Sequence, residues 1–196
     1  MGFAISRAAA DAGALVTLIA GPVSLTTPKG VARVNVESAT DMYETAMERI
    51  RETDIYVGAA AISDYRPAQT VAKKIKKTAD TFTLKMIKSP DLLATLAALD
   101  NGPFTVGFAE ETDKLEEHAL TKLEGKRLDM IVAYLVGNKL GFDRDDNSAI
   151  IMWSGGSQAV PNMPKTELAR QLVAMIASRY RAGSGVEAGH LKPAVS

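Results

Sequence analysis

Residues 104–136 read FTVGFAEETDKLEEHALTKLEGKRLDMIVAYLV and contain the pattern that decides the fold. Two short apolar runs, FTVGFA (104–109) and DMIVAYLV (129–136), enclose a polar segment with helical spacing at 113–126. Short runs of this kind, almost free of charge, are typical of strands that are buried on both faces of a parallel sheet. The stretch therefore predicts a strand–helix–strand unit with a right-handed crossover.

The same alternation continues in both directions along the chain. Further strands are expected at LVTLIAG (15–21), VARVNV (31–36), IYVGAAA (55–61) and AIIMW (149–153), and further helices at 3–12, 40–51, 91–100 and 165–180. This order predicts an α/β fold: a three-layer, Rossmann-like, doubly wound and mostly parallel sheet. One domain is expected over 1–181, followed by a disordered Gly/Ala/Pro-rich tail over 182–196.

Two local features refine this prediction. KIKK (74–77) and FTLKMIK (82–88) alternate apolar and polar residues, which predicts a small β-hairpin flap outside the parallel sheet. Ser89 followed by Pro90 is the usual start of a helix, with serine at the N-cap and proline at the first helical position.

Composition excludes several classes of protein. Twenty-three Lys and Arg balance 23 Asp and Glu, and this zero net charge argues against a nucleic-acid-binding protein. The chain has no cysteine, which rules out disulfides, thiolate nucleophiles and Cys-ligated metals. No apolar run approaches the roughly 18 residues of a membrane span, and the start lacks the pattern of a signal peptide. A cytoplasmic enzyme or binding domain is expected.

In a doubly wound sheet, ligands bind beyond the carboxyl ends of the strands. Gly58, Ala59 and Ala60 end one predicted strand, and their small size would let a planar base or a ribose approach the backbone. Asp64 follows and could accept hydrogen bonds from a nucleoside or help to hold a metal ion. The alternative is an ordinary strand end at which Asp64 caps a turn.

A lysine-rich segment lies just beyond. KKIKK (73–77) has four lysines in five residues, and Lys85 and Lys88 follow. Lysines that close over a polyphosphate would neutralise the charge of a leaving pyrophosphate. The alternative is a solvated edge strand that uses lysines against aggregation.

A third group follows the strand 104–109. Lys122 and Lys126 lie four residues apart and so on one face of the predicted helix. They are either phosphate ligands or exposed helix lysines among glutamates. Phe108 is either a core residue or a platform on which a base stacks. The acidic loop before AIIMW could contribute second-shell groups to Mg²⁺, but no metal ligands are assigned.

In order and spacing, AAAISDYRPA, KIKK, TLKMIKSPDLL, VGFAEET, the two helix lysines, DMIVA and GFDRDDN resemble phosphopantothenate–cysteine ligase. This is the C-terminal ligase half of the bacterial bifunctional decarboxylase/ligase flavoprotein of coenzyme A biosynthesis. The opening MGFAISRAAADAGALVTLIAGPVSL is also similar to that family, so the resemblance covers roughly residues 1–180.

The resemblance implies a two-step reaction in which CTP activates 4′-phosphopantothenate as an acyl-cytidylate and the amine of cysteine then attacks. It also implies a homodimer that needs Mg²⁺ or a similar divalent ion, and no FMN in this part of the family protein. Lys74 would be the catalytic flap lysine. The nucleotide ligands implied by the family motifs are Gly58, Ala59, Ala60, Asp64, Lys74, Ser89, Pro90, Asp91, Leu92, Phe108, Lys122 and Lys126.

Two departures from the family pattern bear on activity. The family's first strand and Gly-rich phosphate loop would precede Met1, and the family usually has Asn-Asp where this chain has Tyr134-Leu135. One alternative is therefore an inactive, truncated remnant that binds CTP or needs a partner to complete its fold. A Rossmann-like NAD(P) reductase is the other, and the absence of GxGxxG argues against it.

Overall fold

The computed structural model describes residues 1–71, 73–76, 80–111, 113–135 and 146–184. In these residues no helix is long and apolar enough to span a membrane. The elements, in chain order, are α1 (Gly2–Asp11), β1 (Val16–Ala20), β2 (Val31–Asn35), α2 (Ala39–Arg49) with a 3-10 turn (Ile50–Glu52), β3 (Ile55–Gly58), β4 (Tyr65–Pro67), β5 (Met86–Lys88), α3 (Leu92–Ala97), β6 (Phe104–Glu111), α4 (Leu115–Gly125), β7 (Met130–Leu135), β8 (Asp146–Trp153), β9 (Gly156–Pro164) and α5 (Lys165–Ser184).

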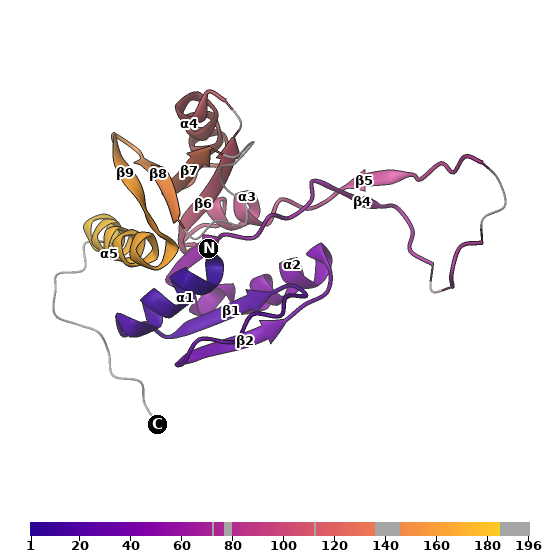
Figure 1. Cartoon of the computed structure of the whole chain (residues 1–196), viewed down its shortest axis with the longest axis horizontal. Helices are drawn as coiled ribbons and strands as arrows, with labels where there is room; N and C mark the ends of the chain where they lie inside the picture. Colours follow the sequence, from indigo (N-terminus) through magenta and orange to yellow (C-terminus); the bar gives the residue numbers. More distant parts are fainter. Residues whose placement is uncertain (72, 77–79, 112, 136–145, 185–196) are drawn as a thin grey trace.

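The α/β prediction is confirmed, with helices on both faces of the sheets (Figure 1). Strands β3, β6 and β7 are parallel and continue through antiparallel β8 and β9 into one five-stranded sheet. Strands β1 and β2 form a separate parallel pair. The parallel strands therefore fall into two hydrogen-bonded groups rather than one continuous sheet.

Two layers of helices hold these sheets. Helices α1 and α5 cover one face, where their side chains pack on Val106, Val132 and Ile151 of the large sheet. Helices α2, α3 and α4 cover the other face, in two clusters centred on Leu96 and Ile131. Because β6 and β7 lie between two layers, both faces of these strands carry fully buried apolar residues, such as Val106 and Ala109 in β6 and Ile131 and Val132 in β7.

Local chemistry explains where the helices begin and end. Ser38 and Asp41 form a capping box at the start of α2, where each side chain accepts a hydrogen bond from the other residue's backbone N–H. Gly13 has φ +90° just after α1, the left-handed conformation that glycine adopts most easily.

Several predicted boundaries were wrong. The N-cap of α3 is Asp91, which accepts a hydrogen bond from Ala94 N–H at 3.0 Å, and not Ser89. The strand β9 was not predicted, because its sequence is polar and contains two prolines. Helix α5 continues to Ser184, so residues 182–184 are not part of a tail. The rest of the predicted tail lies outside the described residues.

The predicted hairpin was only partly correct. Strand β5 pairs with β4, which lies upstream of the lysine run, and the described part of KIKK is not a strand. These two short strands belong to an arm, the described residues 65–71, 73–76 and 80–88, that leaves the fold beside α3 and extends away from it (Figure 1). The segment is polar on average and long enough to leave the core. Because it has no core to pack against, its alternation of apolar and polar residues did not produce a strand pair of the predicted length.

Candidate functional site

The site is built where β3 and β6 end and α1 and α3 begin. Gly2, the first residue of α1, lies against Ala59, with 3.7 Å between the position of a Cβ at Gly2 and the Cβ of Ala59. Parallel strands end at the same edge of the sheet, so the residues that follow β3 and β6 are neighbours. The sequence predicts the site at this edge, and the structure brings the residues that follow β3 and β6 together there.

Gly58 pairs with Gly107 across β3 and β6, and both positions face α3. A Cβ at Gly107 would lie 2.7 Å from Leu128 and 2.9 Å from Leu93, so any larger residue there would force these two leucine side chains to shift. A Cβ at Gly58 would lie 3.4 Å from Leu93. The glycines allow α3 to pack close to the strand ends, and Gly58 thereby fixes where the first turn of α3 lies.

The residues that lead into α3 and begin it include four of the predicted ligands. Ser89 and Leu92 are buried, whereas Pro90 and Asp91 are exposed. The backbone N–H of Ser89 donates to the carbonyl of Asp64 at 2.7 Å, which joins the two predicted segments at the root of the arm. Ser89 is 8% exposed, and its hydroxyl has no hydrogen-bond partner among the described atoms. An unpartnered buried hydroxyl is costly, and a ligand oxygen would satisfy it.

Both helix lysines are held by carboxylates. Lys126 Nζ lies 2.8 Å from Asp91 Oδ2, which connects the end of α4 to the start of α3. Lys122 Nζ lies 2.6 Å from Glu111 Oε1, at the end of β6. His118 Nδ1 contacts the other oxygen of Glu111 at 3.1 Å. The two lysines therefore extend from one helix toward the strand ends and are both engaged with anionic oxygens.

The pKa values reflect these contacts. Burial alone would raise the pKa of Glu111, but the hydrogen bond and charge of Lys122, together with His118, lower it. Burial likewise opposes ionisation of Asp91, and Lys126 with the N–H of Ala94 lowers its pKa. Both carboxylates are thus ionised at neutral pH, and the lysines occupy positions that suit anionic oxygens of a ligand.

Phe108 is half-buried at the edge of this region, and its ring meets that of Tyr134 edge-on at 6.3 Å. The phenol of Tyr134 donates a short hydrogen bond to Glu110. Burial, followed by the Glu110 carboxylate, raises the pKa of Tyr134. Where the family usually has Asn-Asp, this chain has Tyr134-Leu135, and the neutral phenol ring of Tyr134 packs edge-on against the ring of Phe108.

The structure does not bring Lys74 to the other ligands. It lies on the arm, is exposed, and the arm extends away from α3 and α4 (Figure 1). Asp64 is exposed at the root of the same arm. The acidic loop 137–145 lies outside the described residues. Among the residues that are described, no group of three or more His, Cys, Asp or Glu could hold a metal ion.

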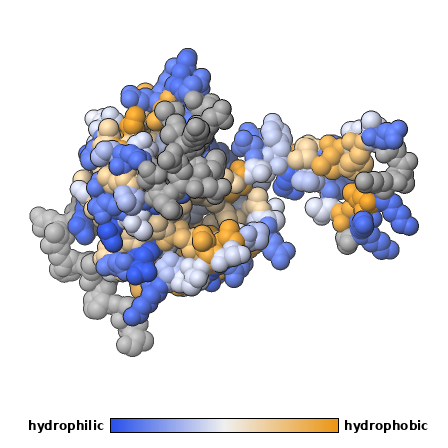
Figure 2. Space-filling view, in the orientation of Figure 1, coloured by the Kyte–Doolittle hydropathy of each residue, from blue (hydrophilic) through white to orange (hydrophobic). Residues whose placement is uncertain are grey.

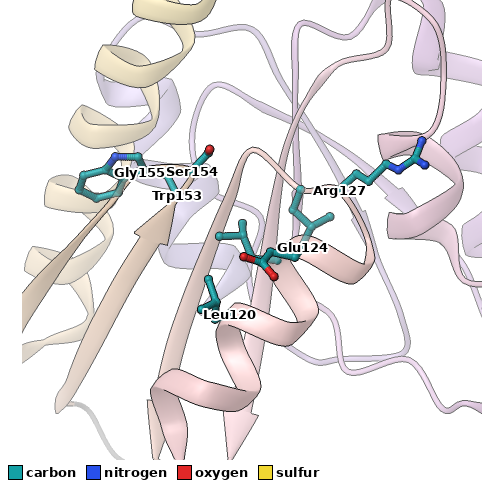
Figure 3. A pocket seen from close by; sticks show the side chains of 8 residues that line it. Leu120, Glu124, Arg127, Trp153, Ser154 and Gly155 are labelled. Atoms are coloured by element: carbon teal, nitrogen blue, oxygen red, sulfur yellow. The ribbon is translucent and has the colours of Figure 1, made fainter.

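Three contacts at this edge were not predicted from the sequence: those of Glu111, those of His118 and the Tyr134–Glu110 pair. Glu111 was visible as a carboxylate at a strand end, but Lys122 is 11 residues away and no local periodicity connects them. A hollow between α4 and the β8–β9 turn is a separate feature (Figure 3). It lies where β7 begins and β8 ends, at the opposite edge of the sheet, and the ring of Trp153 turns away from it toward α5, where Arg179 stacks on it.

Fold and site together define a Rossmann-like α/β domain in which two lysine–carboxylate pairs lie at the edge made by α3, α4 and the ends of β3 and β6. The model of one family, the C-terminal domain of DNA/pantothenate metabolism flavoproteins, matches residues 1–180. The chain belongs to this family.

Known proteins agree with this assignment. Coenzyme A biosynthesis bifunctional protein CoaBC of Haemophilus influenzae is 45% identical over 182 residues, which are 92% of this chain and 46% of that protein. The chain thus spans about half the length of the curated relatives it matches. The crystal structure of the C-terminal domain of a CoaBC is 30% identical with a TM-score of 0.77, covering 92% of this chain and 82% of the other.

A Cab2 mutant in complex with phosphopantothenate-cysteine has the same fold, with 14% identity, a TM-score of 0.56, and coverage of 81% of this chain and 56% of the other.

Proposed function

We propose that this chain is a ligase that joins 4′-phosphopantothenate to cysteine with CTP, in the synthesis of coenzyme A. The observation that carries the proposal is the pair of α4 lysines fixed at the strand ends, Lys122 on Glu111 and Lys126 on Asp91. Membership of the family and the likeness to CoaBC proteins support the choice of substrates.

In the first step a carboxylate oxygen of phosphopantothenate attacks the α-phosphorus of CTP. An acyl-cytidylate forms and pyrophosphate leaves. In the second step the cysteine amine attacks the acyl carbon, the amide bond forms, CMP leaves, and the amine releases one proton. Lys122 and Lys126 would bind the triphosphate and stabilise the pyrophosphate that leaves. Ser89 would donate its free hydroxyl to a phosphate or ribose oxygen, and Phe108 would stack on the base.

A divalent ion would enter with the triphosphate. Mg²⁺ in nucleotide sites usually keeps waters and takes one or two protein carboxylates besides the phosphates. Asp91 and Glu111 offer oxygen ligands of this kind, and each is released when a phosphate replaces it on its lysine. The donor set therefore fits Mg²⁺, whose role would be to neutralise charge on the phosphates.

Calorimetric titration with CTP and Mg²⁺ tests this proposal. Lys122→Gln and Lys126→Gln should each weaken CTP binding about tenfold to a hundredfold, the usual value of one charged hydrogen bond. Lys114→Gln is the matched control, since Lys114 pairs with Glu117 in the exposed first turn of α4. Absence of CTP binding by the unsubstituted chain, or equal losses in all three variants, would contradict the nucleotide role.

We further infer a homodimer in which the arm contacts the second copy. The arm exposes Tyr65, Val71, Ile75, Phe82 and Leu84. Figure 2 shows hydrophobic side chains gathered on the arm beside hydrophilic ones. An extended segment that keeps so much apolar surface in water is unusual for a monomer. Such an arm can bring Lys74 to the site of the other copy.

Complementation tests this arrangement. Lys74→Gln and Lys122→Gln chains should each be inactive, and mixing them should restore activity, because a mixed dimer has one site with both lysines. If Lys74 acts within its own chain, each site of the mixed dimer lacks one of the two lysines, and mixing restores no activity. For the converse test, a double variant, Lys74→Gln with Lys122→Gln, is mixed with unsubstituted chain. Sharing between copies predicts loss of all activity in that mixed dimer, and action within one chain predicts half.

A further inference from the structure

Each carboxylate of the two lysine–carboxylate pairs is held by a second hydrogen bond. In the first pair, Oδ2 of Asp91 contacts Lys126, whereas Oδ1 accepts from the backbone N–H of Ala94 at 3.0 Å. This N–H belongs to the first turn of α3, which Asp91 caps. Asp91 would therefore keep its place at the start of α3 if Lys126 moved to a ligand.

The second pair has the same construction, but here the second donor is a side chain. Oε1 of Glu111 lies 2.6 Å from Nζ of Lys122, and Oε2 lies 3.1 Å from Nδ1 of His118. His118 lies one turn before Lys122 on α4, so two side chains of one helical face reach the same carboxylate. The side chain of Glu111 is 14% exposed, against 40% for His118 and 45% for Lys122. The carboxylate is thus enclosed at the end of β6, and its two partners contact it from the surface.

The position of one proton on His118 follows from its partner. Burial opposes the ionisation of Glu111, but the hydrogen bonds and charges of Lys122 and His118 lower its pKa. An ionised carboxylate only accepts hydrogen bonds, so Nδ1 of His118 must carry a hydrogen and donate it. His118 therefore holds Glu111 in place independently of Lys122.

These second hydrogen bonds matter when a triphosphate binds. Its oxygens would take Lys122 and Lys126 from their carboxylates. A carboxylate with no other partner could then rotate into water, but Asp91 and Glu111 each keep one hydrogen bond and stay beside the phosphates. Two negative charges at this position repel a triphosphate that carries no cation and attract one that carries a divalent cation.

We propose that His118 is a positioning residue that makes the site select the metal complex of the nucleotide over the free triphosphate. It does so by holding the charge of Glu111 beside Lys122. The N–H of Ala94 gives Asp91 the same role beside Lys126, but a backbone donor cannot be removed by substitution of its side chain. This inference rests on the proposed binding of CTP by the two lysines.

A role of His118 in fastening α4 to β6 alone has a different consequence. Its loss would then lower the stability of the chain and weaken nucleotide binding by the same factor with and without a cation. Positioning of the Glu111 charge instead predicts opposite effects on the two forms of the nucleotide. The quantity to measure is therefore the ratio of the dissociation constant of CTP in a chelator to that of CTP with Mg²⁺.

Calorimetric titration of the full chain measures this ratio. In His118→Leu it should fall about tenfold or more, because Glu111 can turn away: free CTP should bind more tightly and Mg²⁺–CTP more weakly. His118→Asn should restore most of the ratio, since its amide N–H can replace the Nδ1–H of the ring. Glu111→Gln should lower the ratio at least as much as His118→Leu, because the charge itself is removed.

The matched control is Glu117→Gln, which also removes a carboxylate from α4, but one that pairs with Lys114 in the exposed first turn. Its ratio should equal that of the unsubstituted chain. The proposal is overturned if His118→Leu weakens both forms of the nucleotide by the same factor, or if Glu111→Gln keeps the original ratio. Failure of the unsubstituted chain to bind CTP in either form would contradict the nucleotide role of the lysines, and this inference with it.

Discussion

The charged contacts at the site show what can be inferred from single residues. The spacing of Lys122 and Lys126 placed them on one helical face, and the structure puts both at the site. Their partners were not predicted, because Glu111 and Asp91 come from other elements and the acidic neighbours within α4 seemed equally suitable. Local spacing reveals which face a residue occupies, whereas pairing across elements depends on tertiary packing.

Replacement of Lys126 by methionine should change the titration of Asp91. The lysine keeps the pKa of Asp91 below its ordinary value against the opposing effect of burial. The stability that this carboxylate contributes is present above its ordinary pKa and is lost as pH falls through the lowered one. In Lys126→Met the pKa should rise and this loss should begin at higher pH. NMR titration of the Asp91 carboxyl measures it, and an unchanged pKa would exclude the ion pair in solution.

Two tyrosines with raised pKa values predict that the free energy of unfolding falls at alkaline pH. Burial raises the pKa of Tyr56 to about 12, from 10.0. A raised pKa means that the folded chain holds its proton longer than the unfolded chain, so stability is full below pH 10 and falls as pH rises toward 12. The slope should approach about 1.4 kcal/mol per pH unit for this residue.

Urea unfolding from pH 9 to 12 measures this slope, and Tyr56→Phe should remove the contribution of Tyr56. Tyr134 adds a second contribution of the same sign, since its pKa is also raised. The variant Tyr134→Phe serves as the comparison for it. Equal alkaline slopes in the unsubstituted chain and in Tyr56→Phe would contradict burial of that phenol.

At the scale of elements, the strongly patterned segments were predictable and the weakly patterned ones were not. Strands β6 and β7 and helix α4 followed directly from short apolar runs around a helical segment. The predicted hairpin failed in register, since β5 pairs with β4 and not with KIKK. Alternation in an exposed segment is set by solubility as much as by pairing, so it carries less structural information than alternation next to a core.

The arm can be shortened without loss of the core. Replacement of residues 70–83 by Asn-Gly would leave the paired residues Tyr65 and Lys88 and remove Lys74 with most of the exposed apolar side chains. The free energy of unfolding should change by less than about 1 kcal/mol, because exposed residues contribute little. Light scattering should show loss of the dimer. A persisting dimer, or a large loss of stability, would contradict the role given to the arm.

For the whole molecule, the division of the parallel strands into two groups was not predictable from the sequence. Each strand has the composition of a buried strand, and a pattern along one strand does not specify its neighbours. The prediction of one doubly wound sheet was right about the class of fold, whereas the described parallel strands pair in two groups.

This division predicts unequal protection across the fold. Amides of β6 and β7, such as those of Val106, Ile131 and Val132, lie in the fully buried centre and should exchange only on global unfolding. Amides of β1 and β2, which pair with no strand of the large sheet in the described part of the chain, should exchange through a smaller opening. Hydrogen exchange with mass spectrometry distinguishes the two groups, and identical rates would show that this division does not weaken cooperativity.

The position of the arm has one more consequence. The chain leaves the core after β3 and returns before α3, and these two ends are joined at the root by the bond from Ser89 to Asp64. A cut in the exposed stretch between would leave two polypeptides, one with α1 to β3 and the other with α3 to α5. They would share the β3–β6 ladder and two apolar clusters. The gene can therefore be split there, and the two products, expressed together, should assemble into the same domain.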